Sequence, residues 1–137
     1  DSIMRTNFTG TFLFCREGAR IMKKNGFGRI INLTTIATPL KLEGESAYAS
    51  SKAAIVTLTQ ILGKELAEFG ITVNAIGPSP IKTDLIRTIS KNKIEQLINS
   101  LSVKRYGEIR DVINVIDFFI KAESDYVTGQ VIYLGGV

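Results

Sequence analysis

The sequence contains no histidine and a single cysteine, Cys15, among its 137 residues. Without histidine there can be no Ser-His-Asp triad, no cysteine–histidine nucleophile and no histidine-ligated metal. One thiol excludes an internal disulfide, and it fits a reducing compartment. No apolar run reaches the ~18 residues of a membrane span, and no signal-peptide pattern opens the printed sequence. We therefore expect a cytoplasmic protein that has no membrane partner and binds no metal.

The charge of the chain is close to balanced, with 17 lysine and arginine residues against 13 acidic residues and a net charge of +4. The basic residues are scattered, and the only adjacent pairs are Lys23-Lys24 and Lys104-Arg105. A nucleic-acid interface needs such residues gathered on one face, so we expect no nucleic-acid partner. With 45% hydrophobic and 22% charged residues, the composition is that of one globular domain.

Hydrophobic periodicity predicts alternating helices and strands. Four segments carry helical patterns: residues 4–25, 47–69, 83–101 and 108–121. Three short apolar runs have the pattern of buried strands, at 29–33, 71–76 and 130–134, and residues 34–46 are expected to be a loop. This alternation predicts an α/β fold with a doubly wound parallel sheet. Three strands make a small sheet and none precedes the first helix, so we expect residues 1–137 to be the C-terminal portion of such a domain.

The sharpest chemical feature is the pair Tyr48 and Lys52. Four residues apart on a helix, the two side chains lie on one face. An ammonium beside a phenol favours the phenolate and lowers its pKa, which gives a proton donor usable near neutral pH without histidine. The same spacing also arises by chance, with a half-buried tyrosine and a solvated lysine. The pair follows a strand and a polar loop, where open α/β sheets place their sites, and this favours the chemical interpretation.

Four further segments, in chain order, form a recognisable set. They are residues 28–35 (GRIINLTT), 48–54 (YASSKAA), 74–78 (NAIGP) and 126–130 (YVTGQ), the last followed by Gly135-Gly136. Together they resemble the fifth strand, the Tyr-x-x-x-Lys helix, the segment after the sixth strand and the C-terminal signature of the short-chain dehydrogenase/reductase family. The resemblance covers the whole chain. It implies a Rossmann-like fold and NAD or NADP as the cofactor.

The resemblance implies catalytic roles for three residues around the helix. Tyr48 matches the family's catalytic acid/base, and Lys52 matches the lysine that lowers its pKa and holds the nicotinamide ribose. Thr35 lies 13 residues before Tyr48 and matches the hydroxyl that orients the substrate. The family usually has serine there, and the methyl group of threonine narrows its rotamers. The neighbouring Thr34 is the weaker candidate for this hydroxyl.

The resemblance also implies four supporting residues. Asn7 matches the asparagine that helps to hold a proton-relay water, although a polar side chain here could equally satisfy a helix distortion. Pro78, Ile81 and Thr83 match the segment that grips the nicotinamide amide. Ser79 stands where the family usually has glycine, which makes this turn less adaptable.

The implied reaction is hydride transfer between NAD(P)(H) and a small-molecule carbonyl or alcohol substrate. Among the enzymes of this reaction class, we expect a 3-oxoacyl-carrier-protein reductase first. A polyol, sugar or steroid dehydrogenase is the alternative. Such reductases often carry basic residues at the turns before strands five and six, but residues 25–27 and 68–70 contain none. Residues 83–101 are expected to form the substrate lid. Because of Thr35 and Ser79, a non-catalytic assembly or binding subunit remains the alternative.

The glycine-rich phosphate loop of the family has no counterpart in the sequence. Residues 26–28 (GFG) precede a strand and fit a helix-to-strand turn, with no third glycine at the required spacing. The residue that selects NAD or NADP is also absent. We therefore expect the 137 residues alone to bind neither cofactor tightly and to be inactive, whereas the parent protein is an enzyme.

Apolar residues beyond one face of two helices predict self-association. They are Phe14 and Ile21 on the opening helix, and Leu58, Ile61 and Leu62 on the Tyr48 helix. In the resembled family these helices pair with their symmetry mates in a four-helix bundle. We therefore expect the parent protein to be a homodimer or homotetramer.

Overall fold

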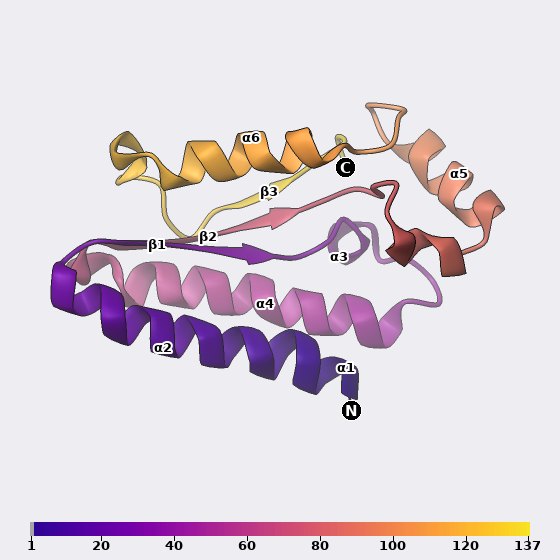
Figure 1. The fold of residues 1–137 in the computed structure, drawn as a ribbon. Coiled ribbons are helices and arrows are strands. Elements are labelled where there is room, and N and C mark those ends of the chain that lie inside the picture. The colour runs from indigo at the N-terminus through magenta and orange to yellow at the C-terminus, as the bar shows by residue number, and fades with distance from the viewer. Residues whose placement is uncertain (1) are drawn as a thin grey trace.

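The computed structural model describes residues 2–137, which form a parallel sheet between two layers of helices (Figure 1). The strands are β1 (Gly28–Leu33), β2 (Ile71–Gly77) and β3 (Val131–Tyr133). The helices are α1 (Ser2–Met4), α2 (Gly10–Asn25), α3 (Ala37–Leu40), α4 (Ser46–Glu65), α5 (Lys91–Ser100) and α6 (Ile109–Ile120). A π-helical turn at Arg5–Thr9 joins α1 to α2, and 3₁₀ turns lie at Ala67–Phe69, Asp84–Thr88 and Ala122–Ser124.

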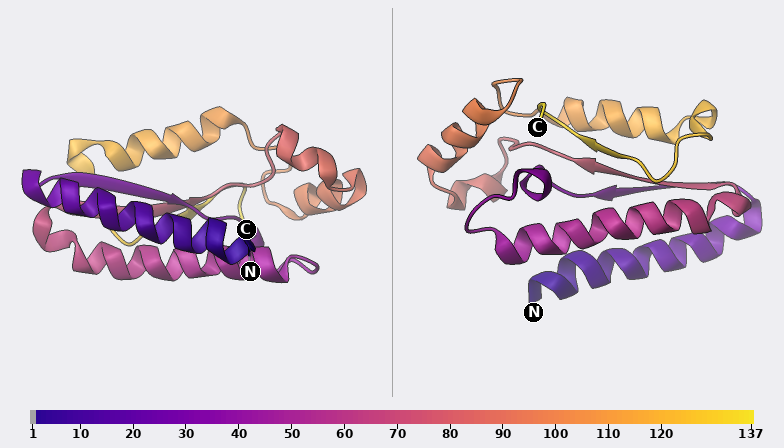
Figure 2. Two further views of the ribbon diagram at one scale, coloured as in Figure 1. Left: turned by 60° about the horizontal axis from the view of Figure 1, so that its bottom comes forward. Right: turned by 180° about the vertical axis from the view of Figure 1, so that it is seen from behind.

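The three strands lie in the order β1-β2-β3, and both pairs are parallel. Strands β1 and β2 pair from Gly28 opposite Ile71 to Leu33 opposite Ile76, whereas β3 pairs with the last residues of β2. Helices α2 and α4 cover one face of the sheet and α6 covers the other, as the views in Figures 1 and 2 agree. The predicted doubly wound parallel arrangement is thereby confirmed.

Strand β2 is the centre of the core because helices lie on both of its faces. Every residue of β2 is buried, including the polar Thr72 and Asn74 that lie between its apolar residues. Ile71 and Val73 pack in one cluster with Ala19 of α2 and with Leu66, which directly follows α4. Helices α2 and α4 therefore share one apolar layer with the sheet.

Two glycines end the helices that form this layer. Gly26 follows α2 with φ 63°, and Gly70 follows the 3₁₀ turn after α4 with φ 70°. Both angles lie in the left-handed region that favours glycine. The amide of Gly28 donates to the main-chain oxygen of Gly70 at 3.2 Å, and a Cβ on Gly70 would collide with the main-chain oxygen of Gly26. The turns that lead into β1 and β2 are thus packed directly together.

Three of the expected elements differ in detail from the structure. Residues 34–46, expected to be a loop, contain α3, whose Pro39 lies in the first turn, where a helix makes no use of the missing N–H. The helix expected at 47–69 ends at Glu65 and continues as a 3₁₀ turn. The helical region at 83–101 is broken, because Ile89 and Ser90 are extended between a 3₁₀ turn and α5.

The outer face predicted for α2 and α4 is partly wrong. Leu58 is buried in the core, and Leu62 packs half-buried against the apolar layer, because both face the sheet. Phe14, Ile21 and Ile61 do lie outside, with exposed fractions of 84%, 65% and 48%. Three of the five predicted residues are therefore exposed, and Phe12 and Leu13 of α2 are exposed as well.

Helix α6 begins with a capping arrangement that includes an ion pair. Its cap residue Glu108 donates its amide to Asp111 Oδ2 at 2.8 Å, and Arg105 contacts both carboxylate oxygens of Asp111 at 2.7 and 3.0 Å. The Arg105 side chain and the Glu108 amide lower the pKa of Asp111 from 3.8 to about 2. The charged carboxylate is therefore favoured by the folded state.

The folded protein should lose part of its stability when Asp111 becomes protonated. Because the pKa of Asp111 is lower in the folded state, its contribution is complete above 3.8 and disappears as the pH falls towards 2. We expect Asp111→Asn to flatten the fall in unfolding free energy across this range, as measured by urea titration at a series of pH values. Asp117→Asn, on the exposed side of the same helix, is the matched control. Equal pH dependence in wild type and Asp111→Asn would contradict the prediction.

Candidate active site

The candidate site lies where β1 and β2 end side by side. Beyond the strands, the amide of Thr34 donates to the main-chain oxygen of Ile76 at 2.8 Å, and the amide of Ile36 donates to that of Pro78 at 3.3 Å. These two bonds continue the parallel pairing past the last residues of both strands. The loops that carry Thr35 and Pro78 therefore leave the sheet next to each other, at the edge where parallel α/β sheets place their sites.

Two neighbouring threonines at the end of β1 have different surroundings. Thr34 is buried, and its hydroxyl donates to the main-chain oxygen of Lys52 at 3.2 Å. Thr35 is half-buried, and its Oγ1 accepts the amide of Ala37 at 3.3 Å, at the start of α3. A hydroxyl that accepts in this way keeps its own proton to donate. The geometry thus supports Thr35, rather than Thr34, as the hydroxyl that can meet a substrate.

Tyr48 and Lys52 lie in the first turns of α4, on one face as their spacing predicts. Both side chains are half-buried. The ammonium of Lys52 donates to the main-chain oxygen of Leu33, the last residue of β1, at 3.0 Å. Burial lowers the pKa of Lys52. Together with the bond from Thr34, this contact attaches the Lys52 turn of α4 to the end of β1.

Asn7 lies in the π-helical turn before α2, a kind of distortion that often marks functional sites. Its amide nitrogen Nδ2 donates to Ser51 Oγ at 3.0 Å, and its main-chain oxygen accepts the hydroxyl of Thr11 at 2.7 Å. Ser51 in turn donates to the main-chain oxygen of Tyr48 at 2.7 Å. The structure therefore brings the Asn7 side chain to the Tyr48 turn of α4, whereas the bond within the distorted helix is made by the main-chain oxygen of Asn7.

The residues expected to grip the nicotinamide lie after β2. Pro78 and Ile81 are half-buried and Thr83 is exposed, and the amide of Thr83 donates to the main-chain oxygen of Ile81 at 2.7 Å. Ile81 also forms a parallel bridge with Gly107. Ser79 is buried in an ordinary backbone conformation, with its hydroxyl beside Gly107. This turn has no need of the glycine that the family usually has.

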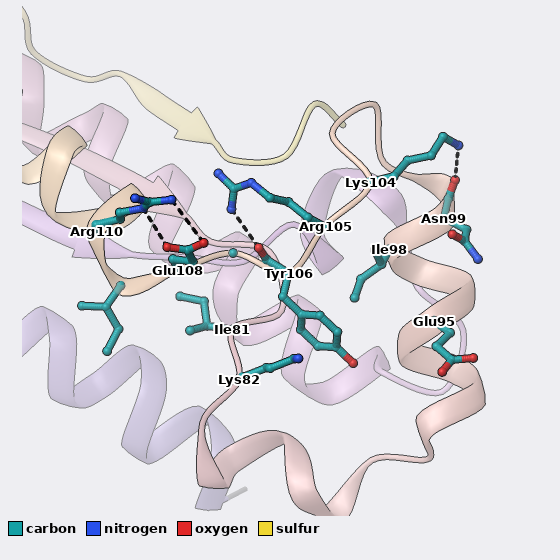
Figure 3. Close-up of a pocket in the computed structure, with 12 residues that line it drawn as sticks. Ile81, Lys82, Glu95, Ile98, Asn99, Lys104, Arg105, Tyr106, Glu108 and Arg110 are labelled. Carbon is teal, nitrogen blue, oxygen red and sulfur yellow. Dashed lines mark hydrogen bonds and ion pairs between the residues drawn. The ribbon is translucent and has the colours of Figure 1, made fainter.

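A hollow of about 900 Å³ lies beside this loop, between α5 and the start of α6 (Figure 3). Ile81 lines it, whereas Tyr48, Lys52, Thr35 and Asn7 do not.

The basic residues of this hollow already contact other groups of the chain. The ammonium of Lys82 lies 4.9 Å from the centre of the Tyr106 ring, and Lys104 donates to the main-chain oxygen of Asn99 at 2.7 Å. Arg110 pairs with Glu108 at 2.7 Å, as Figure 3 shows, in the same way that Arg105 pairs with Asp111. The positively charged side chains that line the hollow are therefore largely engaged by other groups of the protein.

Sequence reasoning missed Ser51 and Thr11, which hold Asn7 in place. The signal for Ser51 was present, because a residue three positions after Tyr48 on a helix lies on nearly the same face. The hollow could not be foreseen, since its lining comes from three separate segments. Within residues 2–137 no group of histidine, cysteine, aspartate and glutamate side chains could hold a metal ion. No helix in this part of the chain is both long and apolar enough to cross a membrane.

Comparison with known proteins identifies the family. The model described as "Enoyl-(Acyl carrier protein) reductase" matches residues 1–136. The chain belongs to the short-chain dehydrogenase/reductase family. The 3-oxoacyl-[acyl-carrier-protein] reductases FabG of Staphylococcus epidermidis and Rickettsia felis are 34% and 33% identical to it over 136 residues, which is 99% of this chain.

Solved structures of dehydrogenases have the same fold. NAD+-bound xylitol dehydrogenase superposes with a TM-score of 0.87 at 28% identity, over 98% of this chain and 58% of that structure. A protein assigned as a gluconate dehydrogenase from Agrobacterium tumefaciens gives 0.90 at 32% identity, over 97% and 53%. The 136 aligned residues are 56% of the Staphylococcus and Rickettsia reductases, so the chain spans about half the length of these curated relatives. The predicted membership of this family is confirmed.

The two threonines at the end of β1 should respond differently to valine. Thr34→Val removes a buried hydroxyl and leaves the main-chain oxygen of Lys52 without that donor, so unfolding free energy should fall by about 1 kcal/mol. Thr35→Val removes the acceptor of the Ala37 amide and should cost a similar amount of stability, but it should also lower the reduction rate of the complete protein by a factor on the order of 10²–10³. Thr35→Ser, which keeps the hydroxyl, is the control. If the rate loss followed Thr34 instead, the assignment of the hydroxyl would be wrong.

Proposed function

We propose that the complete protein is a nicotinamide-dependent oxidoreductase that interconverts a carbonyl compound and an alcohol. The observation that carries this proposal is that Lys52 bonds the last residue of β1, two residues before Thr35, while Asn7 is linked through Ser51 to the Tyr48 turn of the same helix. This set provides a proton donor, a cation and a neutral hydroxyl without histidine or a metal ion. The membership of the chain in a family of oxidoreductases supports the same reaction.

The residues present fit one end of a nicotinamide cofactor. The ammonium of Lys52 has three donors, of which one reaches the main-chain oxygen of Leu33, so others remain for the hydroxyl groups of a ribose. Pro78, Ile81 and Thr83 follow β2 at the same edge of the sheet and would hold the nicotinamide amide. The cofactor can be NAD or NADP, since neither choice depends on these residues.

The chemistry of the site divides between the cofactor and three side chains. When bound, the cofactor supplies the hydride for the carbonyl carbon. The Tyr48 hydroxyl gives its proton to the carbonyl oxygen, and the Thr35 hydroxyl donates a hydrogen bond to the same oxygen as negative charge develops. Lys52, one helical turn after Tyr48, supplies the positive charge of the site and a donor for the cofactor ribose. In the reverse direction Tyr48 accepts the proton of an alcohol.

Among possible substrates we propose a 3-oxoacyl thioester first. The closely packed turns before β1 and β2 contain no basic residue, but neighbouring cations lie over their rings. Lys23 Nζ is 3.9 Å from the centre of the Phe69 ring, and Arg29 Cζ is 4.5 Å from that of Phe27. These cations support docking of an acidic carrier protein. The carrier would have to present its acyl group on an arm of about 20 Å, the length of six extended residues, to reach the other end of β1.

Replacing Tyr48 by phenylalanine should nearly abolish turnover. The ring keeps its packing, but the proton donor is lost, and a positioned acid or base typically contributes about 10²–10⁴-fold in rate. The rate should be followed by NAD(P)H absorbance in the complete protein, with cofactor affinity measured separately. Cofactor binding should survive the change. Retention of more than about a tenth of the wild-type rate would be incompatible with the role of Tyr48, and would favour a non-catalytic binding subunit.

We further propose that the complete protein forms a homodimer or homotetramer through α2 and α4. Phe14, Ile21 and Ile61 are large apolar side chains exposed on these helices, and exposed apolar surface is what a contact with a second copy would bury. Phe14→Glu should shift the mass measured by light scattering towards the monomer at micromolar concentration. Lys24→Glu, at the exposed end of α2, is the control for added charge. A wild-type protein that is only monomeric would refute the proposal.

A further inference from the structure

Ser51 links Asn7 to the Tyr48 turn of α4 through two hydrogen bonds of its side chain. Within residues 2–137 no other side chain makes this link. The Ser51 side chain has an exposed fraction of 0%. Its Oγ accepts Nδ2 of Asn7 at 3.0 Å and donates to the main-chain oxygen of Tyr48 at 2.7 Å. Both the proton and a lone pair of this hydroxyl are therefore used, each by a residue of the candidate site.

The two bonds of Ser51 join elements that are distant in the sequence. Asn7 belongs to the π-helical turn before α2, whereas Tyr48 belongs to the first turns of α4. A hydroxyl three residues after Tyr48 can donate to its main-chain oxygen within the helix, and its two lone pairs then remain to accept. Nδ2 of Asn7 uses one of them. The orientation of the Asn7 side chain is thus coupled to the position of the Tyr48 turn.

We propose that Ser51 is a positioning residue, which fixes Asn7 relative to Tyr48. Asn7 can then hold the proton-relay water in the position from which the proton that Tyr48 donates is replaced. The inference rests on the function proposed above. Ser51 itself is fully buried and contacts no substrate, so it acts through Asn7 and through the main chain of Tyr48. An alanine at this position removes the acceptor of Nδ2 and the donor to the Tyr48 oxygen while leaving the side-chain volume almost filled. Asn7 is then free to turn away from the orientation that α4 imposes.

The adjacent serine provides a matched control on the same helix. Ser50 is exposed, so Ser50→Ala makes the same chemical change one residue away from the buried contact. Ser51→Cys keeps a group of similar size with a weaker hydrogen bond, and serves if the alanine variant folds poorly. The variants are made in the complete protein, and their folded state is compared by circular dichroism and thermal unfolding.

Three kinetic results are expected from these variants. Ser51→Ala should lower kcat by about 10- to 100-fold, with KM changed less than about threefold, because it misplaces a reacting turn rather than a binding surface. Ser51→Cys should fall between alanine and wild type. Ser50→Ala should equal wild type in kcat, KM and pH dependence.

The pH dependence of kcat distinguishes positioning from a merely structural role. If Ser51 acts through Asn7, Ser51→Ala and Asn7→Ala should change the pH profile in the same way, and the double variant should add little to either. A structural defect would instead lower kcat by the same factor at every pH and add to the effect of Asn7→Ala. Wild-type kcat in Ser51→Ala, or additive effects with an unchanged pH profile, would overturn the inference.

A failure of the proposed function would look different from a failure of this inference. In that case Tyr48→Phe would leave the rate unchanged, or the wild type would reduce no carbonyl compound. The coupling between Asn7 and Ser51 is then measured by thermal unfolding of the two single variants and the double variant. Additive losses of stability would show that the Asn7–Ser51 bond does not form, and would overturn the inference independently of activity.

Discussion

The parallel pairing of β1 with β2 is the constraint on which the rest of the site depends. It continues past the strands through the amides of Thr34 and Ile36, so the two loops that follow are held at a fixed distance by main-chain bonds. A one-residue slip in this register would turn the side chains of β1 to the opposite face. Every residue of β2 is buried, so such a slip would disrupt the apolar contacts of both helical layers. The apolar core therefore fixes the register of β1 and β2, and this register sets the relative position of the two loops of the candidate site.

The first turns of helix α4 are attached to the end of β1 by two reciprocal bonds, in each of which a side chain donates to a main-chain oxygen. Lys52 donates to the oxygen of Leu33, while Thr34 donates to the oxygen of Lys52. Farther along α4, Gly63 leaves no room for a Cβ, which would lie 2.6 Å from the amide nitrogen of Gly129. The helix is thus held at both ends. The proposed catalytic pair, Tyr48 and Lys52, gains from this rigidity, because it would have to stay within hydrogen-bond reach of a substrate.

The sequence predicted the features that depend on a local pattern, and it did not predict the contacts between distant segments. The fold follows from apolar periodicity, and Tyr48 with Lys52 follows from helical spacing, because both depend on local order alone. The family resemblance already favoured Thr35 over Thr34 by its spacing from Tyr48, and the structure adds a physical reason, since Thr34 is buried and its hydroxyl is bonded to α4. Helical spacing places Ser51 on nearly the same face as Tyr48, but it does not indicate a partner for its hydroxyl. Its contact with Asn7 spans 44 residues, and no local pattern reports it.

Ser79 and Thr35, the two departures from the family pattern, lie in loops whose paths are fixed by hydrogen bonds of the main chain. Ser79 lies between residues whose main-chain oxygens, on Pro78 and Pro80, accept the amides of Ile36 and Gly107. The loop therefore keeps its path without a glycine. Thr35 accepts the amide of Ala37 through its side chain, as serine also could, and its extra methyl leaves the hydroxyl proton available. Neither substitution removes a group that the reaction needs, so neither argues for a protein that has lost its catalytic function.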